Sequence, residues 1–325
     1  MKICMKTIYC TTIFSLAIFL SSCSGKTENK ITDYIISEKD IIPEGVAFDT
    51  ETQTIFVSST NKRKIVSITG DGKITDFIRE SQDDIKSVIG MEVDAKTKSL
   101  WVVSSEAPQV LPLKNPGSRQ WWSSVYQFNL PDGKLLKKYN LRKDTVFLND
   151  ITIADDGTAY ITETVKGTIY KIAQGEDTLQ VFLQPDPYTY ANGICFADKP
   201  GILFVCCSEG IITINVSDKK YSLLPVAGNN KAHGIDGLSF NDNYFIAHQS
   251  TAVTRFYLNA TRDTITSSDT LNTGKEFDSS TTGEVSGNNY YFIVNSQVRS
   301  GVDFKNRTIK PPDSLENVII RKIKL

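Results

Sequence analysis

Alternating apolar and polar positions recur along the chain in pairs of short segments joined by turns rich in Asp, Asn or Gly. Each pair predicts two β-strands, because successive side chains of a strand point to opposite faces and the second segment is rich in β-branched and aromatic residues. Six copies of the pair can be aligned between residues 43 and 297. The chain is therefore predicted to repeat one supersecondary unit.

The length of the repeat indicates the architecture. Positions equivalent to Glu44 are separated by 45, 60, 43, 44 and 46 residues, and the long interval holds a Pro-bearing insertion at 106–122 without alternation. Third and fourth strands follow in most units, as at 64–78 and 167–183. Four strands in about 45 residues are typical of a propeller blade, so we predict an all-β, six-bladed β-propeller over 31–325. A β-sandwich is the alternative, although so regular an interval is hard to place on one.

The two ends of the chain predict how the ring closes. The sixth unit has two leading strands and a third at 318–325, after which the chain has no fourth. The segment 30–35 (KITDYI) nearly duplicates 73–78 (KITDFI), the fourth strand of the first unit. We therefore expect the N-terminal strand to complete the last blade, which removes an unpaired edge.

The first 22 residues are predicted to be a signal peptide. Lys2 and Lys6 precede an apolar run at 8–20, which is shorter than the roughly 20 residues that a membrane-spanning helix needs. The run ends in Leu-Ser-Ser-Cys, which resembles the lipobox of bacterial lipoproteins and makes Cys23 the predicted lipidation site. An uncleaved anchor helix is the alternative.

A polar tether at 23–30 is expected to separate the lipid from the folded domain. The predicted location is the bacterial cell envelope, periplasmic or at the outer membrane or cell surface, with the lipid anchor as the sole membrane contact. Outside the signal peptide and Cys23, the cysteines are Cys195, Cys206 and Cys207. They are expected to be small buried hydrophobic residues, and a pairing of Cys195 with Cys206 is left open.

Composition narrows the classes of partner. The chain of 325 residues is 40% hydrophobic and 22% charged, which is typical of a globular protein and excludes intrinsic disorder. Its 36 Lys and Arg residues against 37 Asp and Glu residues leave no basic excess, so nucleic acid is not an expected partner. We expect a monomer that binds a small molecule.

Polar residues recur where the first strand of each unit begins. In a propeller this strand lines the central channel, so the aligned positions form a ring near one mouth, and four of them are Glu44, Asn149, Asn192 and Asp236. Each one alone is also common turn chemistry. Together they offer carboxylate and amide oxygens with a charge of −2, the donor set that calcium prefers. We predict a Ca²⁺ site, with another divalent cation as the alternative; the lack of Cys and His in the ring argues against zinc or copper.

The motifs around these positions resemble a known superfamily. PEG at 43–45, ND at 149–150, NG at 192–193 and DG at 236–237 resemble, in order and spacing, the gluconolactonase, regucalcin and luciferin-regenerating-enzyme superfamily, a relative of the paraoxonases. The resemblance implies a six-bladed propeller in which the four equivalent side chains bind a catalytic divalent metal, usually calcium. It also implies hydrolysis of a lactone or ester.

Two positions depart from the family pattern. Regucalcin-like lactonases hold the sugar acid with an arginine two residues before the first Asn, where this chain has Phe147. Paraoxonase-like relatives bind a second, structural calcium with an Asp directly after the Glu, where this chain has Gly45, and Asp150 would keep only part of such a site. Sugar-lactone specificity is therefore not implied.

Three residues are candidates for the catalytic base. The resemblance makes Asp236 the first, because relatives often use the ligand Asp in this way. His233 and His248 are the others, since a histidine titrates near neutrality and both are expected near the same channel mouth. Hydrogen-bonded structural histidines are the alternative. The predicted substrate pocket comprises Glu163, Glu209, Tyr188 and Tyr190, which could instead be solvated or packed between blades.

We therefore predict a calcium-dependent hydrolase of a lactone or ester, in which the metal activates water and polarises the carbonyl. The alternative is a non-catalytic propeller at the cell surface that binds a ligand or partner and in which calcium is structural. A lyase-like or strictosidine-synthase-like use of the same pocket is a third hypothesis.

Overall fold

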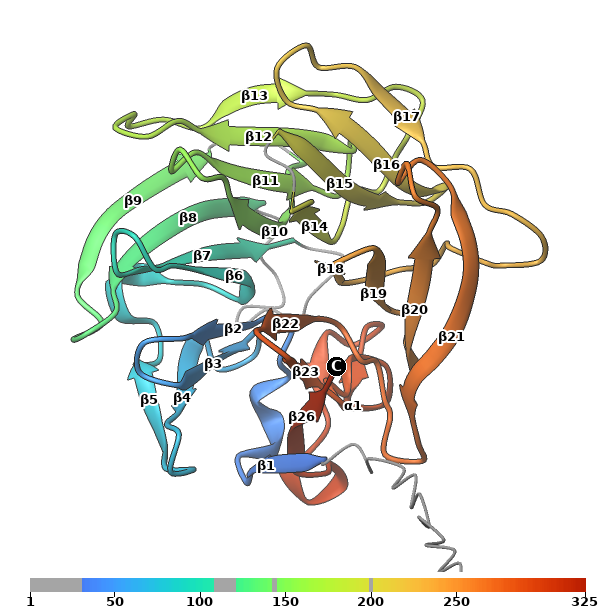
Figure 1. Ribbon diagram of the computed structural model, residues 1–325. Helices are drawn as coiled ribbons and strands as arrows, with labels where there is room; N and C mark the ends of the chain where they lie inside the picture. Colours follow the sequence, from blue (N-terminus) through green and yellow to red (C-terminus); the bar gives the residue numbers. More distant parts are fainter. Residues whose placement is uncertain (1–30, 108–120, 142–144, 199–200) are drawn as a thin grey trace, which may run out of the picture.

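The computed structural model describes residues 31–107, 121–141, 145–198 and 201–325. Six four-stranded sheets are arranged as blades around a common axis (Figure 1), which confirms the all-β, six-bladed propeller. The innermost strands contact one another in a closed ring, which excludes the β-sandwich. These inner strands are β2 (Val46–Asp49), β6 (Val88–Asp94), β10 (Leu148–Ile153), β14 (Ile194–Phe196), β18 (Leu238–Asn241) and β22 (Gly283–Ser286).

In the first five blades the chain proceeds outward from the axis, each strand pairing antiparallel with the one before it. The second strands are β3 (Thr54–Ser59), β7 (Ser99–Glu106), β11 (Ala159–Glu163), β15 (Ile202–Cys207) and β19 (Tyr244–His248). The third strands are β4 (Lys64–Ile68), β8 (Trp122–Asn129), β12 (Thr168–Ile172), β16 (Gly210–Asn215) and β20 (Ala252–Leu258). The outer strands are β5 (Ile74–Ile78), β9 (Leu135–Leu141), β13 (Gln180–Leu183), β17 (Tyr221–Leu223) and β21 (Ile265–Thr273).

The sixth blade joins the two ends of the chain. Its order is β22, β23 (Asn289–Ile293), β26 (Val318–Lys324) and β1 (Thr32–Ile36), so the N-terminal strand completes the last blade as predicted. β1 pairs antiparallel with β26. Arg321 adds a bidentate pair with Asp33, in which Nε and a terminal nitrogen each lie 2.8 Å from a carboxylate oxygen. This geometry fixes the closure more firmly than backbone pairing alone.

Two connections depart from the simple repeat. In blade 6 the link from β23 to β26 contains the short helix α1 (Val298–Gly301) and a small hairpin of β24 (Val302–Asp303) and β25 (Thr308–Ile309). Short 3₁₀ turns occur at Lys39–Ile41, Gln82–Asp84 and Pro312–Ser314. In blade 2 the predicted insertion joins β7 to β8, and its residues 108–120 lie outside the described ranges.

Apolar side chains fill the interfaces between neighbouring blades. Between blades 6 and 1, for example, the rings of Phe48 and Tyr291 stack with centroids 4.3 Å apart. Near the axis the backbones approach too closely for side chains. A Cβ added to Gly45 would lie 2.1 Å from the carbonyl oxygen of Ile89, and one added to Gly237 would lie 2.4 Å from that of Thr281. The glycines that directly follow Glu44 and Asp236 therefore allow the backbones of adjacent blades to approach each other closely.

The predicted signal peptide, Cys23 and the tether lie outside the described residues. Within the described ranges, no helix has the length and apolar composition to cross a bilayer. Cys195, Cys206 and Cys207 are free thiols, and the latter two are buried as expected.

Candidate functional site

The ring positions converge at one end of the inner strands. Glu44, Asn192 and Asp236 each stand two residues before an inner strand, and all three line one pocket of about 430 Å³. The backbone N–H groups of Glu44 and Gly45 donate to the hydroxyl of Ser58 on β3, at 3.0 and 2.7 Å. The backbone N–H of Gly193 donates to the carbonyl of Asp236 at 2.9 Å. Neighbouring strands therefore hold the three side chains together.

The two carboxylates of this pocket influence each other electrostatically. Burial raises the pKa of Glu44 well above 4.5, and the charge of Asp236 raises it further. Burial also raises the pKa of Asp236 to about 6, against the opposing effects of a hydrogen bond from Asn192 and the charge of Arg299. That hydrogen bond joins Asn192 Nδ2 to Asp236 Oδ1 at 2.6 Å. A bound cation would favour the ionised form of both carboxylates.

The fourth ring residue stands beside this pocket rather than among its lining residues. Asn149 Nδ2 donates to Thr164 Oγ1 at 2.9 Å, and Thr164 donates to the carbonyl of Ala191, also at 2.9 Å. Asn149 is therefore linked through Thr164 to the residue that precedes Asn192. Its amide nitrogen is occupied, which leaves the amide oxygen as the group able to accept a ligand.

Two hydroxyl groups of the pocket lack a partner. Thr281 Oγ1 and Ser250 Oγ are buried and make no hydrogen bond in the described structure, and both residues line the pocket with the carboxylates. An unsatisfied buried polar atom destabilises a protein, so such atoms are expected to meet water or a ligand. The donor set of the pocket, with its carboxylate, amide and hydroxyl oxygens, fits a hard divalent cation with its water shell.

Within the described ranges, no group of three or more His, Cys, Asp or Glu side chains is placed to hold a metal ion. The candidate ring relies instead on two carboxylates and two amides. Amide oxygens are ordinary ligands for calcium, whereas zinc and copper favour nitrogen and sulfur.

The two candidate histidines lie in different environments, one exposed and one buried. His233 lines the pocket and is exposed. The expected position of His248 at the mouth is corrected, since its side chain is 0% exposed and turns into the interface with blade 6. There its ring nitrogens bond Ser280 Oγ at 2.8 Å and Tyr290 OH at 2.7 Å, and burial lowers its pKa to about 3. His248 is placed as a neutral structural residue and not as a base.

The expected position of Glu163 in the pocket is also corrected. Glu163 is 1% exposed, and its Oε1 accepts the backbone N–H groups of Phe147 and Val165 at 3.1 and 2.8 Å, while Oε2 accepts that of Lys166 at 3.0 Å. With its carboxylate so occupied, Glu163 organises the turn after β11.

The other three predicted pocket residues lie in different places, and one of them lines the pocket. Tyr190 lines the pocket and is 59% exposed. Tyr188 instead packs edge-on against Tyr221, with ring centroids 6.2 Å apart. Glu209 is exposed and accepts the backbone N–H of Thr189 at 3.3 Å, next to the lining residue Ser208. Tyr190 is thus the aromatic wall of the pocket.

Sequence patterns missed several lining residues. Ser250 comes from the turn between β19 and β20 within blade 5, Ser279 and Thr281 come from the connection between blades 5 and 6, and α1 adds Val298 and Arg299. The connections are not part of the repeated strand pair, so an alignment of repeats gives them no equivalent positions.

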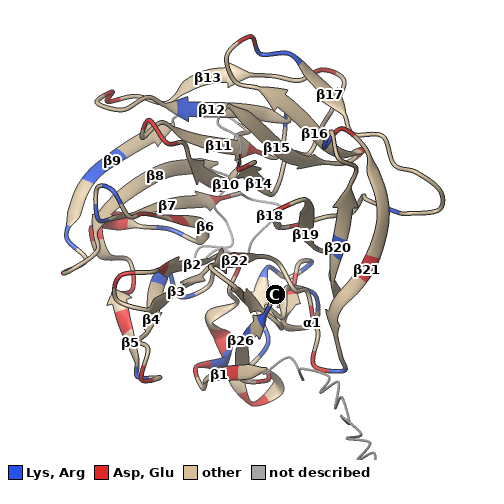
Figure 2. Cartoon of the chain, in the orientation of Figure 1, with Lys and Arg blue, Asp and Glu red and all other residues tan. Residues whose placement is uncertain are grey.

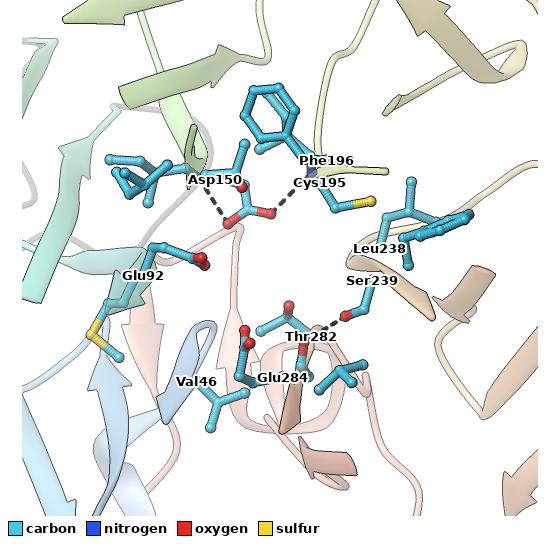
Figure 3. A pocket seen from close by; sticks show the side chains of 17 residues that line it. Val46, Glu92, Asp150, Cys195, Phe196, Leu238, Ser239, Thr282 and Glu284 are labelled. Atoms are coloured by element: carbon cyan, nitrogen blue, oxygen red, sulfur yellow. Dashed lines mark hydrogen bonds between the residues drawn. The ribbon is translucent and has the colours of Figure 1, made fainter. Parts of the chain in front are cut away.

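A second pocket of about 300 Å³ occupies the channel along the inner strands (Figure 3). Glu92, Asp150 and Glu284 point into it from three different blades. Burial raises the pKa of Asp150 to about 7 and that of Glu284 to about 8, and the charge of Asp150 contributes to the latter. Burial raises the pKa of Glu92, and the negative charge of Glu284 raises it further. Figure 2 shows the acidic positions on the inner strands around the axis.

Asp150 connects the two pockets. Its carboxylate accepts the backbone N–H groups of Ile151 at 2.9 Å and Ile194 at 3.2 Å, and the charge of Asp236 contributes to its raised pKa. It stands where other blades have glycine after the ring position, and its Oδ1 occupies the space beside Gly90. The acidic groups of the two pockets therefore influence one another electrostatically.

Together, the fold and the pocket define a class: a six-bladed propeller with an acidic, oxygen-rich pocket at one mouth of its axis. Solved structures of the same fold include a gluconolactonase from Xanthomonas campestris, with a TM-score of 0.62 and 13% identity over 91% of this chain and 90% of that one. They also include the calcium-binding protein regucalcin from Agrobacterium tumefaciens, with a TM-score of 0.59 and 12% identity over 89% and 94%.

A third similar structure is virginiamycin B lyase from Staphylococcus aureus, with a TM-score of 0.57 and 17% identity over 92% of this chain and 100% of that one. No protein-family model matches the chain, and no curated protein sequence is similar enough to match. A gluconolactonase and regucalcin, which belong to the superfamily that the sequence motifs resemble, thus share this fold, and so does a lyase. At these identities the similarity shows the fold alone.

Proposed function

We propose that this protein is a divalent-cation-dependent hydrolase of a lactone or ester. The observation that carries the proposal is the meeting of Glu44, Asn192 and Asp236 in one axial pocket with two unpartnered hydroxyls. The similarity in fold to a gluconolactonase and to regucalcin supports it. Calcium is the cation that best suits these oxygen donors.

The proposed ligands are Glu44, Asp236 and the amide oxygens of Asn192 and Asn149. A bound calcium ion would supply Lewis-acid polarisation of a carbonyl and a lower pKa for bound water. Asp236 is the proposed base, because its carboxylate lines the pocket and a bound cation would keep it ionised and able to accept a proton. His233, at the exposed rim, is the second candidate to hold a proton. The ring of Tyr190 would cover the apolar part of a substrate.

The test is a thermal melt of residues 26–325, which contain every strand of the propeller, with calcium, magnesium or excess chelator. A ligand that binds the native state alone stabilises it by about 2.7 kcal/mol at 100 times its Kd. We expect a calcium-selective rise in Tm that Glu44→Gln and Asp236→Asn abolish and that the remote surface variant Glu176→Gln retains. A calcium-supported hydrolysis of lactones or aryl esters, lost in Asp236→Asn, would then establish the activity. A melt indifferent to cations contradicts the proposal.

The second candidate function is a non-catalytic ligand-binding propeller with a structural cation. Phe147 favours it, since the position at which similar lactonases carry an arginine is here 5% exposed and packed in the core between blades 2 and 3. Calcium-dependent stability without turnover of any lactone or ester would support this alternative.

For the N-terminus we propose a lipid anchor on Cys23 in the bacterial cell envelope. Mass spectrometry of the membrane-extracted protein should find an acylated N-terminal Cys23, and Cys23→Ser should release the protein from the membrane fraction.

A further inference from the structure

Arg299 brings a positive charge to the mouth of the axial pocket. It lies on α1, in the connection between β23 and β26, and lines the pocket with Glu44 and Asp236. The side chain is exposed, and its guanidinium makes no ion pair or hydrogen bond in the described structure. In contrast, the guanidinium groups of Arg255 and Arg321 are paired with carboxylates. Arg299 is thus a cation available to a ligand.

The backbone around Arg299 is held firmly by its neighbours. The N–H of Arg299 donates to Ser279 Oγ at 3.3 Å. Gln297, just before α1, exchanges hydrogen bonds with the backbone of Glu316, donating to its carbonyl at 3.0 Å and accepting its N–H at 2.7 Å. Ser300 donates to the carboxylate of Asp278. The helix therefore presents the base of the Arg299 side chain at a fixed place on the rim.

A bound cation would leave the positive charge of Arg299 without an acidic counterpart among the residues that line the pocket. Without a cation, Glu44 and Asp236 give the floor two potential negative charges, and the positive charge of Arg299 helps to lower the pKa of Asp236. A divalent cation would neutralise both carboxylates. Arg299 would then be the uncompensated formal charge among the residues that line the pocket. An anionic group on the bound molecule would complete the balance.

We infer that Arg299 binds a carboxylate on the substrate, so that the substrate class is a lactone or ester that carries a carboxylate beside its reactive ring or bond. The inference rests on the proposed function, for the reaction and for the bound cation that offsets the two carboxylates. A guanidinium suits this role because its planar donors match a carboxylate in a bidentate manner, whereas a lysine would act as a point charge. The substrate's reactive carbonyl would face the carboxylate floor and its own carboxylate would face the rim.

Binding is tested without turnover, with two ring compounds that cannot be hydrolysed as lactones. Tetrahydrofuran-2-carboxylate is the probe and the neutral tetrahydrofuran-2-carboxamide is its control, both followed by ligand-observed NMR with calcium present. We expect the acid to bind the wild type and Arg299→Gln to weaken that binding about 10-fold or more, as for loss of a charged hydrogen bond. Arg299→Lys should recover part of the affinity, and Arg79→Gln, a remote loss of charge, should have no effect.

Turnover is tested with γ-butyrolactone and γ-butyrolactone-γ-carboxylate, which differ by one carboxylate. We expect the wild type to prefer the carboxylated lactone and Arg299→Gln to raise KM for it about 10-fold, with kcat and the neutral lactone little changed. Binding of the acid probe without hydrolysis of either lactone would contradict the proposed function and support the anion site. An acid probe that does not bind, or that binds wild type and Arg299→Gln equally, overturns the inference.

Discussion

Replacing Glu284 with glutamine should stabilise the protein at alkaline pH. Glu284 projects from β22 into the channel pocket, where it faces Glu92 and Asp150 from other blades (Figure 3). Burial, and then the charge of Asp150, raise its pKa from 4.5 to about 8. The native channel therefore favours the neutral acid, and Glu284→Gln supplies a neutral side chain of the same shape.

The sign of the effect follows from proton linkage. Below pH 4.5 the carboxyl is protonated in both the folded and unfolded states, so it adds no pH dependence. Between 4.5 and about 8 the unfolded chain releases the proton while the folded chain retains it, so the free energy of unfolding falls as pH rises. One pKa unit equals about 1.36 kcal/mol, which sets an upper limit of about 5 kcal/mol. Charges in proteins interact as in a medium of higher dielectric constant than a dry interior, so we expect a smaller effect of about 2 kcal/mol.

The assay is urea unfolding at pH 4, 6 and 8.5 with a chelator present, so that no divalent ion offsets the acidic charge. Glu284→Gln should match the wild type at pH 4 and exceed it by about 2 kcal/mol at pH 8.5, with an unchanged m-value. Glu176→Gln, on the surface, should follow the wild type throughout. A variant that is no more stable than the wild type at pH 8.5 would refute the argument that the channel holds Glu284 neutral.

Three further changes test the fold around the site. Gly45→Ala should destabilise the protein by about 3 kcal/mol in denaturant melts, because its Cβ would meet the backbone of Ile89, whereas Gly70→Ala, with room for a methyl group, should cost far less. His248→Ala should lower the free energy of unfolding by about 3 kcal/mol. Between pH 6.5 and 3 the wild type should lose stability, because the unfolded histidine takes up a proton and the buried one does not; the variant should lose less. An acid profile that is the same in both proteins would contradict the burial of His248. Asp33→Asn should weaken the pair with Arg321 that closes the ring, destabilise the protein by about 1 kcal/mol and so lower its Tm; an unaltered Tm would argue against that role.

Repetition is why so much of this fold could be predicted from the sequence. Six strand pairs at similar intervals specify six equivalent blades, and the duplicate segments at 30–35 and 73–78 specify the strand that closes the ring. The same alignment predicted a ring of four polar residues, and all of them except Asn149 line one pocket, namely Glu44, Asn192 and Asp236. Their equivalence in the repeat translates directly into a common position around the axis.

The misplaced residues stand where the direction of a side chain depends on the local register. The backbone of His248 pairs with Asp236 and Gly237, at 2.9 and 3.0 Å, so the sequence was right about its proximity to the ring. Its side chain points the other way, since successive residues of a strand face opposite sides. In blade 3 the register shifts between Leu148 and Ile151, opposite the end of β11, and a bulge of this kind leaves no pattern in hydrophobicity.

The two halves of the pocket thus have different origins. The floor comes from the repeated inner strands, which place Glu44, Asn192 and Asp236 by the symmetry of the ring. The rim comes from connections outside the repeat, including the helix that carries Arg299. A new rim can arise without disturbing the blades, because loops tolerate change better than the strands that they connect. The fold therefore sets the carboxylate and amide floor, whereas the proposed recognition of the substrate depends on a connection that only blade 6 carries among the described residues.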